Sequence, residues 1–124
     1  MMFAALLIVS VPPETPTGRW TNPSGSVTIE IAACGKAYCG TVVAASDKAK
    51  ADAAKGGTKS LVGTQLLSDF APSNHGRWKG RIFIPDLNRH PRADISLVDE
   101  NTLKVRGCAI GRSLCKSQLW TRAD

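Results

Sequence analysis

Four cysteines are the residues of this chain whose type and spacing most clearly permit chemistry. Cys34 and Cys39 lie in CGKAYCG, and Cys108 and Cys115 lie in CAIGRSLC. Thiols at such positions could ligate a metal ion, act as a redox pair or form disulfides. Structural zinc sites usually place two to four residues between paired cysteines, and a redox motif places two. The spacers of four and six residues therefore favour disulfides.

The pairing of these cysteines stays open at the level of sequence, because four cysteines allow three connectivities. Runs typical of strands flank the first pair, IEIAA before it and TVVAA after it. Strands joined by a tight turn bring Cα atoms within bridging distance. Two local disulfides are therefore the favoured arrangement, with a zinc site and free thiols as alternatives.

The N-terminal stretch MMFAALLIVSV carries no charge before Glu14. Its apolar run from Phe3 to Val11 has nine residues, too few to span a bilayer and suited to the core of a signal peptide. Residues 1–13 are thus predicted to be the remnant of a signal peptide, and a buried N-terminal strand is the alternative. The prediction implies a periplasmic or secreted protein without a transmembrane segment, which agrees with disulfides.

The composition indicates one folded domain with a preference for anionic surroundings. A chain of 124 residues, 43% of them hydrophobic, is long enough for one core and too short for two domains. Sixteen Lys and Arg against ten Asp and Glu leave a net charge of +6. Such an excess favours nucleic acid, acidic glycans or membrane headgroups as partners.

Alternating side chains predict an all-β domain over residues 18–124. In SVTIEIA, Val27, Ile29 and Ile31 share one face, as in a half-buried strand. Turn signals recur about every ten residues, the spacing of a sandwich or a barrel. About eight antiparallel strands are expected. The segment near residues 47–56 is predicted to be a short surface helix or a loop, because Ser46 or Asp47 can cap a helix and Gly56 or Gly57 can end it.

The order of several short motifs resembles a known family. GxW at Gly18, CG at Cys34, YCG, LVG, W-x-G-x-I-x-x-P from Trp78, TLKVRGC and the closing WTR follow one another along the chain. The set, which runs from about Gly18 to Arg122, resembles the bacterial exported family called domain of unknown function twenty-one forty-seven. The resemblance implies a lipocalin-like barrel and export, and it implies no established activity.

One segment departs from that family pattern. Its members often carry aspartate, Asn-Pro and arginines before the L-x-G strand, where this chain has DKAKADAAKGGTKS. A shared function of that loop would therefore be lost or altered in this chain.

The first and last strands also resemble the closure of a lipocalin barrel. We expect Trp20 to plug the barrel and the guanidinium of Arg122 to lie on its indole ring, because terminal strands are neighbours in a closed barrel. The alternative is a buried Trp20 with Arg122 free in solvent. A cation–π contact of this kind contributes about 0.5–2 kcal/mol.

Signs of catalysis are weak in this sequence. G-x-S-x-G, H-E-x-x-H and P-loop motifs do not occur. His75 and His90 lie in turn-like stretches and are expected to be solvated. We therefore expect a protein that is not an enzyme and that holds no cofactor and no metal.

Two binding functions remain as candidates. The first is an envelope interaction or structural module whose outer basic face is formed by Arg77, Lys79, Arg81, Lys104 and Arg106. The alternative is a lipocalin-like carrier of a small apolar or amphipathic ligand, lined by Trp78, Ile82, Ile84, Ile95, Leu97, Leu103 and Val105.

These two functions predict different interiors. A connected cavity of about 300 Å³ or more would favour the carrier, whereas a filled barrel with a continuous positive patch would favour the interaction module. Nucleic acid is not expected as a partner, because interleaved aromatic residues are scarce: on the basic strand 76–84, only Phe83 is expected to point outward. We expect a monomer.

Overall fold

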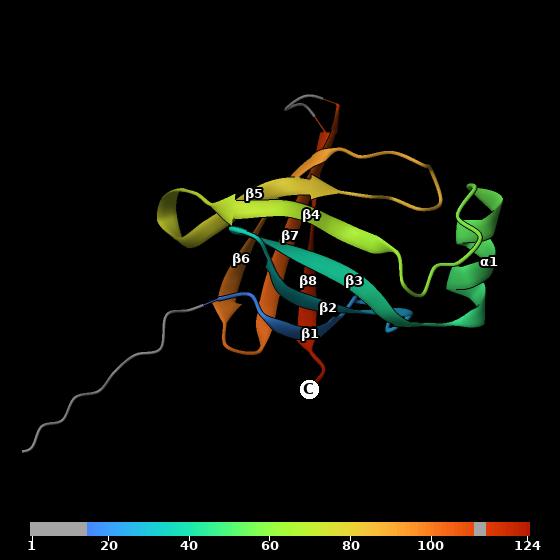
Figure 1. Cartoon of the computed structure of the whole chain (residues 1–124), viewed down its shortest axis with the longest axis horizontal. Coiled ribbons are helices and arrows are strands. Elements are labelled where there is room, and N and C mark those ends of the chain that lie inside the picture. The colour runs from blue at the N-terminus through green and yellow to red at the C-terminus, as the bar shows by residue number, and fades with distance from the viewer. Residues whose placement is uncertain (1–14, 111–113) are drawn as a thin grey trace, which may run out of the picture.

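The computed structural model describes residues 15–110 and 114–124, so the predicted signal residues 1–13 lie outside the described part of the chain. Eight strands follow one another, with one short helix after the third (Figure 1). The elements are β1 (Gly18–Thr21), β2 (Val27–Cys34), β3 (Ala37–Ala45), α1 (Asp47–Lys55), β4 (Gln65–Pro72), the 3-10 turn η1 (Asn74–Gly76), β5 (Arg77–Ile82), β6 (Arg92–Asp99), β7 (Thr102–Ile110) and β8 (Leu114–Arg122).

The strands form a closed antiparallel barrel in which each pairs with the next along the chain. Pairing of β1 with β8 completes the ring, with Trp20 opposite Arg122 and Thr21 opposite Thr121. The expected all-β, eight-stranded lipocalin-like barrel is confirmed, and the open sandwich is excluded. The seam is short, because among the described residues only Thr121 and Arg122 of β8 pair with β1.

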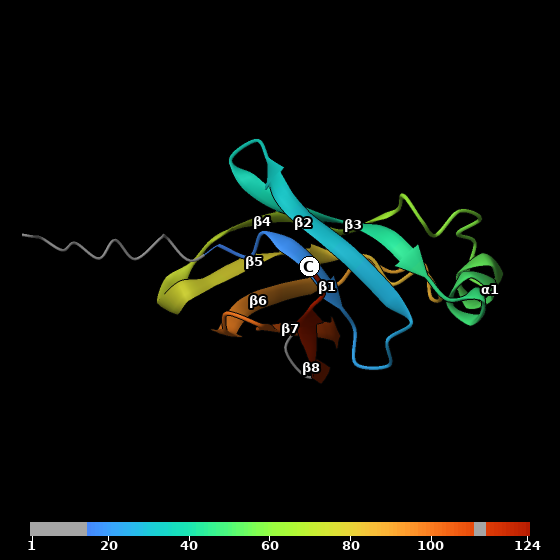
Figure 2. The same ribbon diagram turned by 90° about the horizontal axis from the view of Figure 1, so that it is seen from below.

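Alternate connections lie at opposite ends of this barrel. Helix α1 and the long β5–β6 connection lie at one end, and the β4–β5 hairpin lies at the other (Figures 1 and 2). We call the first the mouth and the second the closed end. In an up-and-down barrel, the β1–β2 connection therefore also belongs to the mouth, as do the paired ends of β7 and β8 at Cys108 and Cys115.

Helix α1 has the capping residues expected from the sequence. The Ser46 hydroxyl accepts a hydrogen bond from the backbone N–H of Ala49 at 3.1 Å, and Gly56 ends the helix. Ala53 is the buried residue of this helix. A Cβ atom on Gly56 would collide with the backbone carbonyls of Pro85 and Asp86, so only glycine lets the helix end pack against the β5–β6 connection.

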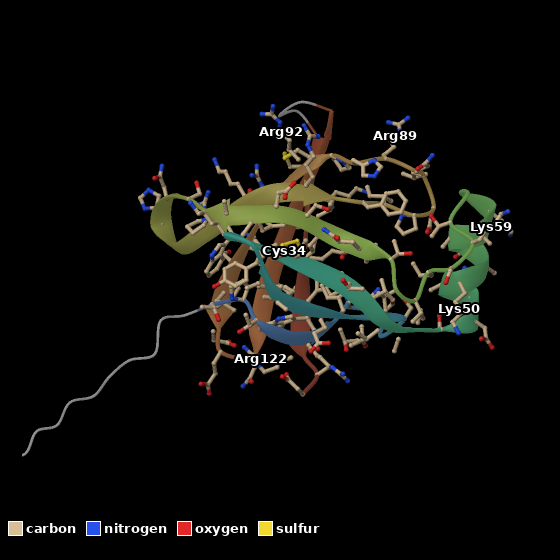
Figure 3. All side chains as sticks on the ribbon, in the orientation of Figure 1. Cys34, Lys50, Lys59, Arg89, Arg92 and Arg122 are labelled. Carbon is tan, nitrogen blue, oxygen red and sulfur yellow. A yellow bond between two sulfur atoms is a disulfide. The ribbon has the colours of Figure 1, made fainter. Side chains whose placement is uncertain are left out.

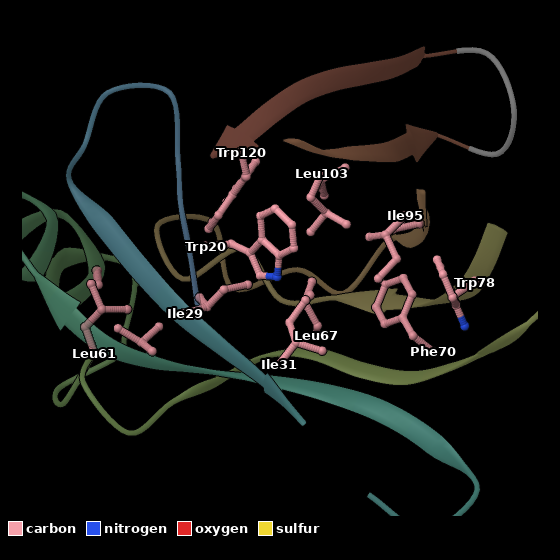
Figure 4. Packing of buried hydrophobic residues seen from close by; sticks show 14 residues of the cluster. Trp20, Ile29, Ile31, Leu61, Leu67, Phe70, Trp78, Ile95, Leu103 and Trp120 are labelled. Carbon is pink, nitrogen blue, oxygen red and sulfur yellow. The ribbon is translucent and has the colours of Figure 1, made fainter. Parts of the chain in front are cut away.

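The core occupies the closed end and the middle of the barrel. Trp20, Phe70, Ile95 and Leu103 are fully buried, and their side chains lie close together (Figure 4). Trp78 lies beside Phe70 there and meets Tyr38 edge-on, with ring centroids 6.3 Å apart. An eight-stranded barrel is just wide enough to be filled by such side chains.

Each cysteine pair forms a local disulfide. Cys34 bonds to Cys39 across the β2–β3 hairpin at the closed end, and Cys108 bonds to Cys115 across the β7–β8 hairpin at the mouth. The favoured local pairing is therefore the one found. Each bridge joins strands that already pair, so it holds the register of its hairpin.

Candidate functional site

A cavity of about 1040 Å³ opens at the mouth of the barrel. Its deep walls are apolar side chains that also face the core: Ile29, Leu66, Leu67, Ile82, Val105 and Trp120. The volume lies at the upper end of the usual range for small-molecule sites, about 300–1000 Å³. The half of the barrel nearer the mouth is thus open, while the other half is filled.

The inward residues of β7 and β8 explain why this half stays open. Val105 and Gly107 face the cavity from β7 and are small. Opposite them in register stand Gln118 and Lys116, which also line the cavity. Among the side chains of β7 and β8 that the structure describes, Trp120 is the only large apolar one in the cavity wall.

The rim of the cavity is polar, in contrast to its floor. Ser24, Ser26 and Lys116 line it together with Lys48, Asp52 and Asp86. The ammonium of Lys48 donates a hydrogen bond to Asp52 at 3.0 Å. That hydrogen bond, helped by the charges of Asp52 and Asp86, raises the pKa of Lys48 above its ordinary value. A molecule with an apolar body and a polar end matches this gradient.

The predicted lining is correct for three residues. Ile82, Ile84 and Val105 do line the cavity. The other four predicted residues do not line it. Three of them belong to the buried core, namely Trp78, Ile95 and Leu103, and Leu97 packs against that core. These four point inward as expected, but they lie too near the closed end to reach the open half.

Other lining residues were missed or oriented wrongly from the sequence. Trp120, which was not among the predicted lining residues, is 8% exposed and points inward, and its Nε1 donates to Gln118 Oε1 at 3.0 Å. Phe83 was expected to point outward, yet it lines the cavity and stacks on His90 with centroids 4.7 Å apart. Strand β5 ends at Ile82, so strict alternation no longer applies to Phe83.

The closed end is sealed by the expected contact between Trp20 and Arg122. The Arg122 guanidinium carbon lies 4.3 Å from the centroid of the indole ring. Arg122 also donates to the backbone oxygen of Glu100 at 2.7 Å and to that of Thr17 at 3.2 Å. A Cβ atom on Gly18, whose φ is +124°, would collide with this guanidinium. Glycine in the GxW motif therefore makes room for the arginine.

The outer face of β5, β6 and β7 carries the expected cations. Arg77, Lys79 and Arg81 are exposed on β5, and Lys104 is exposed on β7. Arg106 is partly exposed, and Arg92 adds a sixth cation from β6 (Figure 3). We call these six residues the basic face. Asp94, on the middle strand, pairs with Arg106 at 3.3 Å.

Metal and membrane features were also sought in the described residues. Within 15–110 and 114–124, no group of three or more His, Cys, Asp and Glu could hold a metal ion. The same part of the chain contains no helix long and apolar enough to cross a bilayer. Of the two histidines, His90 stacks on Phe83, and His75 lies in the η1 turn with φ of 60°.

A closed eight-stranded meander with one filled end and one open end places the chain in the class of lipocalin-like barrels. A solved structure titled "Protein HP1028 from the human pathogen Helicobacter pylori belongs to the lipocalin family" shares this fold, with a TM-score of 0.66 and 12% sequence identity. The similarity covers 87% of this chain and 82% of that one. Comparison with curated proteins gives no match.

The family can be named from the sequence match. Residues 18–122 match the family described as "Uncharacterized protein conserved in bacteria (DUF2147)", and the chain belongs to it.

Proposed function

We propose that this protein binds a small amphipathic molecule in the cavity at the barrel mouth. The observation that carries the proposal is the cavity of about 1040 Å³. This volume exceeds the roughly 300 Å³ expected for a small-molecule carrier. Burial of an apolar body against Ile29, Leu67 and Trp120 contributes roughly 25 cal/mol per Å² removed from water. The polar end of the ligand then remains at the rim, near Lys116 and Asp86.

The first test is retention of a ligand. Native mass spectrometry of the full chain, purified from its own host without detergent, is expected to show a bound small molecule. Titration with 1-anilinonaphthalene-8-sulfonate, which joins an apolar ring system to an anionic group, is expected to show binding of one molecule per chain.

Replacement of Val105 by phenylalanine tests whether that binding occurs in the cavity. Val105 is 7% exposed and forms part of the wall, so the larger ring occupies ligand space. An overpacking cost of about 1–3 kcal/mol in the bound state corresponds to a loss of affinity of about 5- to 150-fold. Val98→Phe is the matched control, because Val98 is 58% exposed on the outside of β6. Equal affinity of the two variants would contradict the proposal.

The basic face favours a second function, interaction with an anionic component of the bacterial envelope. Six cations lie on three adjacent strands, against the carboxylates of Asp94 and Asp99 on the middle one. Cations near an anionic surface contribute about 1 kcal/mol each. We also propose that the protein works outside the cytosol, in the periplasm or in secreted form, since its two disulfides favour an oxidising compartment.

Salt dependence tests this second function. The full chain is expected to co-sediment with phosphatidylcholine vesicles that contain phosphatidylglycerol, and not with phosphatidylcholine alone. Binding is expected to disappear at high salt, because the Debye length falls from about 10 Å at 0.1 M to about 3 Å at 1 M. Binding that persists at 1 M salt, or equal binding to both kinds of vesicle, would argue against it.

A further inference from the structure

The basic face contains a depression that is separate from the barrel cavity. Its volume is about 280 Å³, and its walls are Arg77, Asp94, Ser96, Lys104 and Arg106. These residues point away from the lumen, since they alternate along their strands with the buried Trp78, Ile95 and Val105. The depression therefore offers a second site on the other side of the sheet.

Strand register places a hydroxyl between two cations. Ser96 of β6 is paired with Arg77 of β5 on one side and with Lys104 of β7 on the other. Neighbouring strands lie about 4.8 Å apart, so the Cα atoms of Arg77 and Lys104 are about 10 Å apart. Both long side chains can reach a group held above the short Ser96.

Charge in the depression is only partly balanced. Asp94 neutralises Arg106 through the 3.3 Å ion pair, and the Asp94 side chain is 16% exposed. A guanidinium has five N–H donors, so Arg106 keeps donors for a further acceptor. Within the described part of the chain, Arg77 and Lys104 take part in no ion pair. Two unpaired positive charges thus flank one hydroxyl.

We infer that this depression binds a phosphomonoester group through Arg77, Lys104 and Arg106, with Ser96 beneath it. A phosphomonoester offers three acceptor oxygens and a charge of about −1.5 to −2, which matches three cationic donors better than the two oxygens of a carboxylate. The volume exceeds that of one phosphate, so part of the molecule that bears it also enters. The inference rests on the second function proposed above, and it specifies a phosphomonoester as the anionic group that the basic face binds.

The test is a titration of the full chain with glycerol 3-phosphate, followed by amide chemical shifts in NMR spectra. Shifts are expected around Arg77, Ser96 and Lys104, and none with glycerol. Vesicles provide the second arm: phosphatidic acid carries a phosphomonoester, whereas phosphatidylglycerol carries a diester. Preference for phosphatidic acid with weak binding of glycerol 3-phosphate identifies a lipid as the source, and strong binding of glycerol 3-phosphate identifies a soluble phosphomonoester.

A matched pair of variants separates a built site from diffuse charge. Lys104→Gln is expected to weaken binding about tenfold, because it removes a charge-assisted contact. Lys79→Gln removes the same charge from the same face, but Lys79 does not line the depression, so a change below about twofold is expected. Equal losses would overturn the phosphate site and leave the salt-dependent vesicle binding standing.

Absence of shifts at Ser96 together with equal binding to both anionic lipids would also overturn the inference. Binding of 1-anilinonaphthalene-8-sulfonate should be the same in both variants, which keeps the result independent of the barrel cavity.

Discussion

Replacing Trp20 by alanine is expected to lower the free energy of unfolding by about 3–5 kcal/mol. The indole is fully buried at the closed end, where it contacts the guanidinium of Arg122 and donates from Nε1 to the Pro16 oxygen at 2.9 Å. Its removal leaves a void, an unpaired carbonyl and an arginine without its aromatic partner. The last strand then loses part of its attachment to the first.

Urea denaturation followed by circular dichroism measures this loss. Thermal unfolding of the same variant is expected to show a fall in Tm of more than about 10 °C. Leu119→Ala is the control, because Leu119 is 53% exposed on the outside of β8, and its change should stay within about 0.5 kcal/mol. An unchanged Tm for Trp20→Ala would show that the plug does not hold the barrel together.

Reduction of both disulfides is expected to lower the free energy of unfolding by about 4 kcal/mol or more. Each bridge closes a short loop, Cys34–Cys39 over five positions and Cys108–Cys115 over seven. The chain-entropy account assigns about 2 kcal/mol to each loop of this size. Total stabilities of domains are about 5–15 kcal/mol, so the reduced protein would lose a large share.

The measurement compares urea midpoints with and without reductant, while thiol alkylation and mass spectrometry confirm that four thiols are free. The double variants Cys34→Ser with Cys39→Ser, and Cys108→Ser with Cys115→Ser, separate the two bridges. Each should keep about half of the response to reductant. Identical midpoints for oxidised and fully reduced protein would contradict the expectation.

The two bridges differ in what else they support. Cys115 is part of the cavity wall, so loss of the Cys108–Cys115 bridge loosens the mouth as well as the hairpin. Cys34–Cys39 lies at the closed end, away from the cavity. Stability that depends on oxidised sulfur is useful only where disulfides persist, which supports the proposed location outside the cytosol.

Local patterns were enough to predict most of the fold. Alternation in SVTIEIA predicted β2 because side chains in a strand alternate between its two faces. Cysteines at the ends of short turns predicted hairpin disulfides, and Ser46 with Gly56 predicted the limits of α1. Each of these patterns involves residues that are close together in the chain, so each can be recognised in a single sequence without the tertiary structure.

The cavity, by contrast, was decided by tertiary structure. Alternation correctly turned Ile95, Leu103 and Val105 inward, but only Val105 reaches the open half. Inward direction depends on position within a strand, whereas height along the barrel axis depends on register with every neighbouring strand. The basic face behaves similarly: its cations were visible in the sequence, but pairing of β5, β6 and β7 placed Ser96 between Arg77 and Lys104. Contacts between residues far apart in the chain set that register, and no local pattern records it.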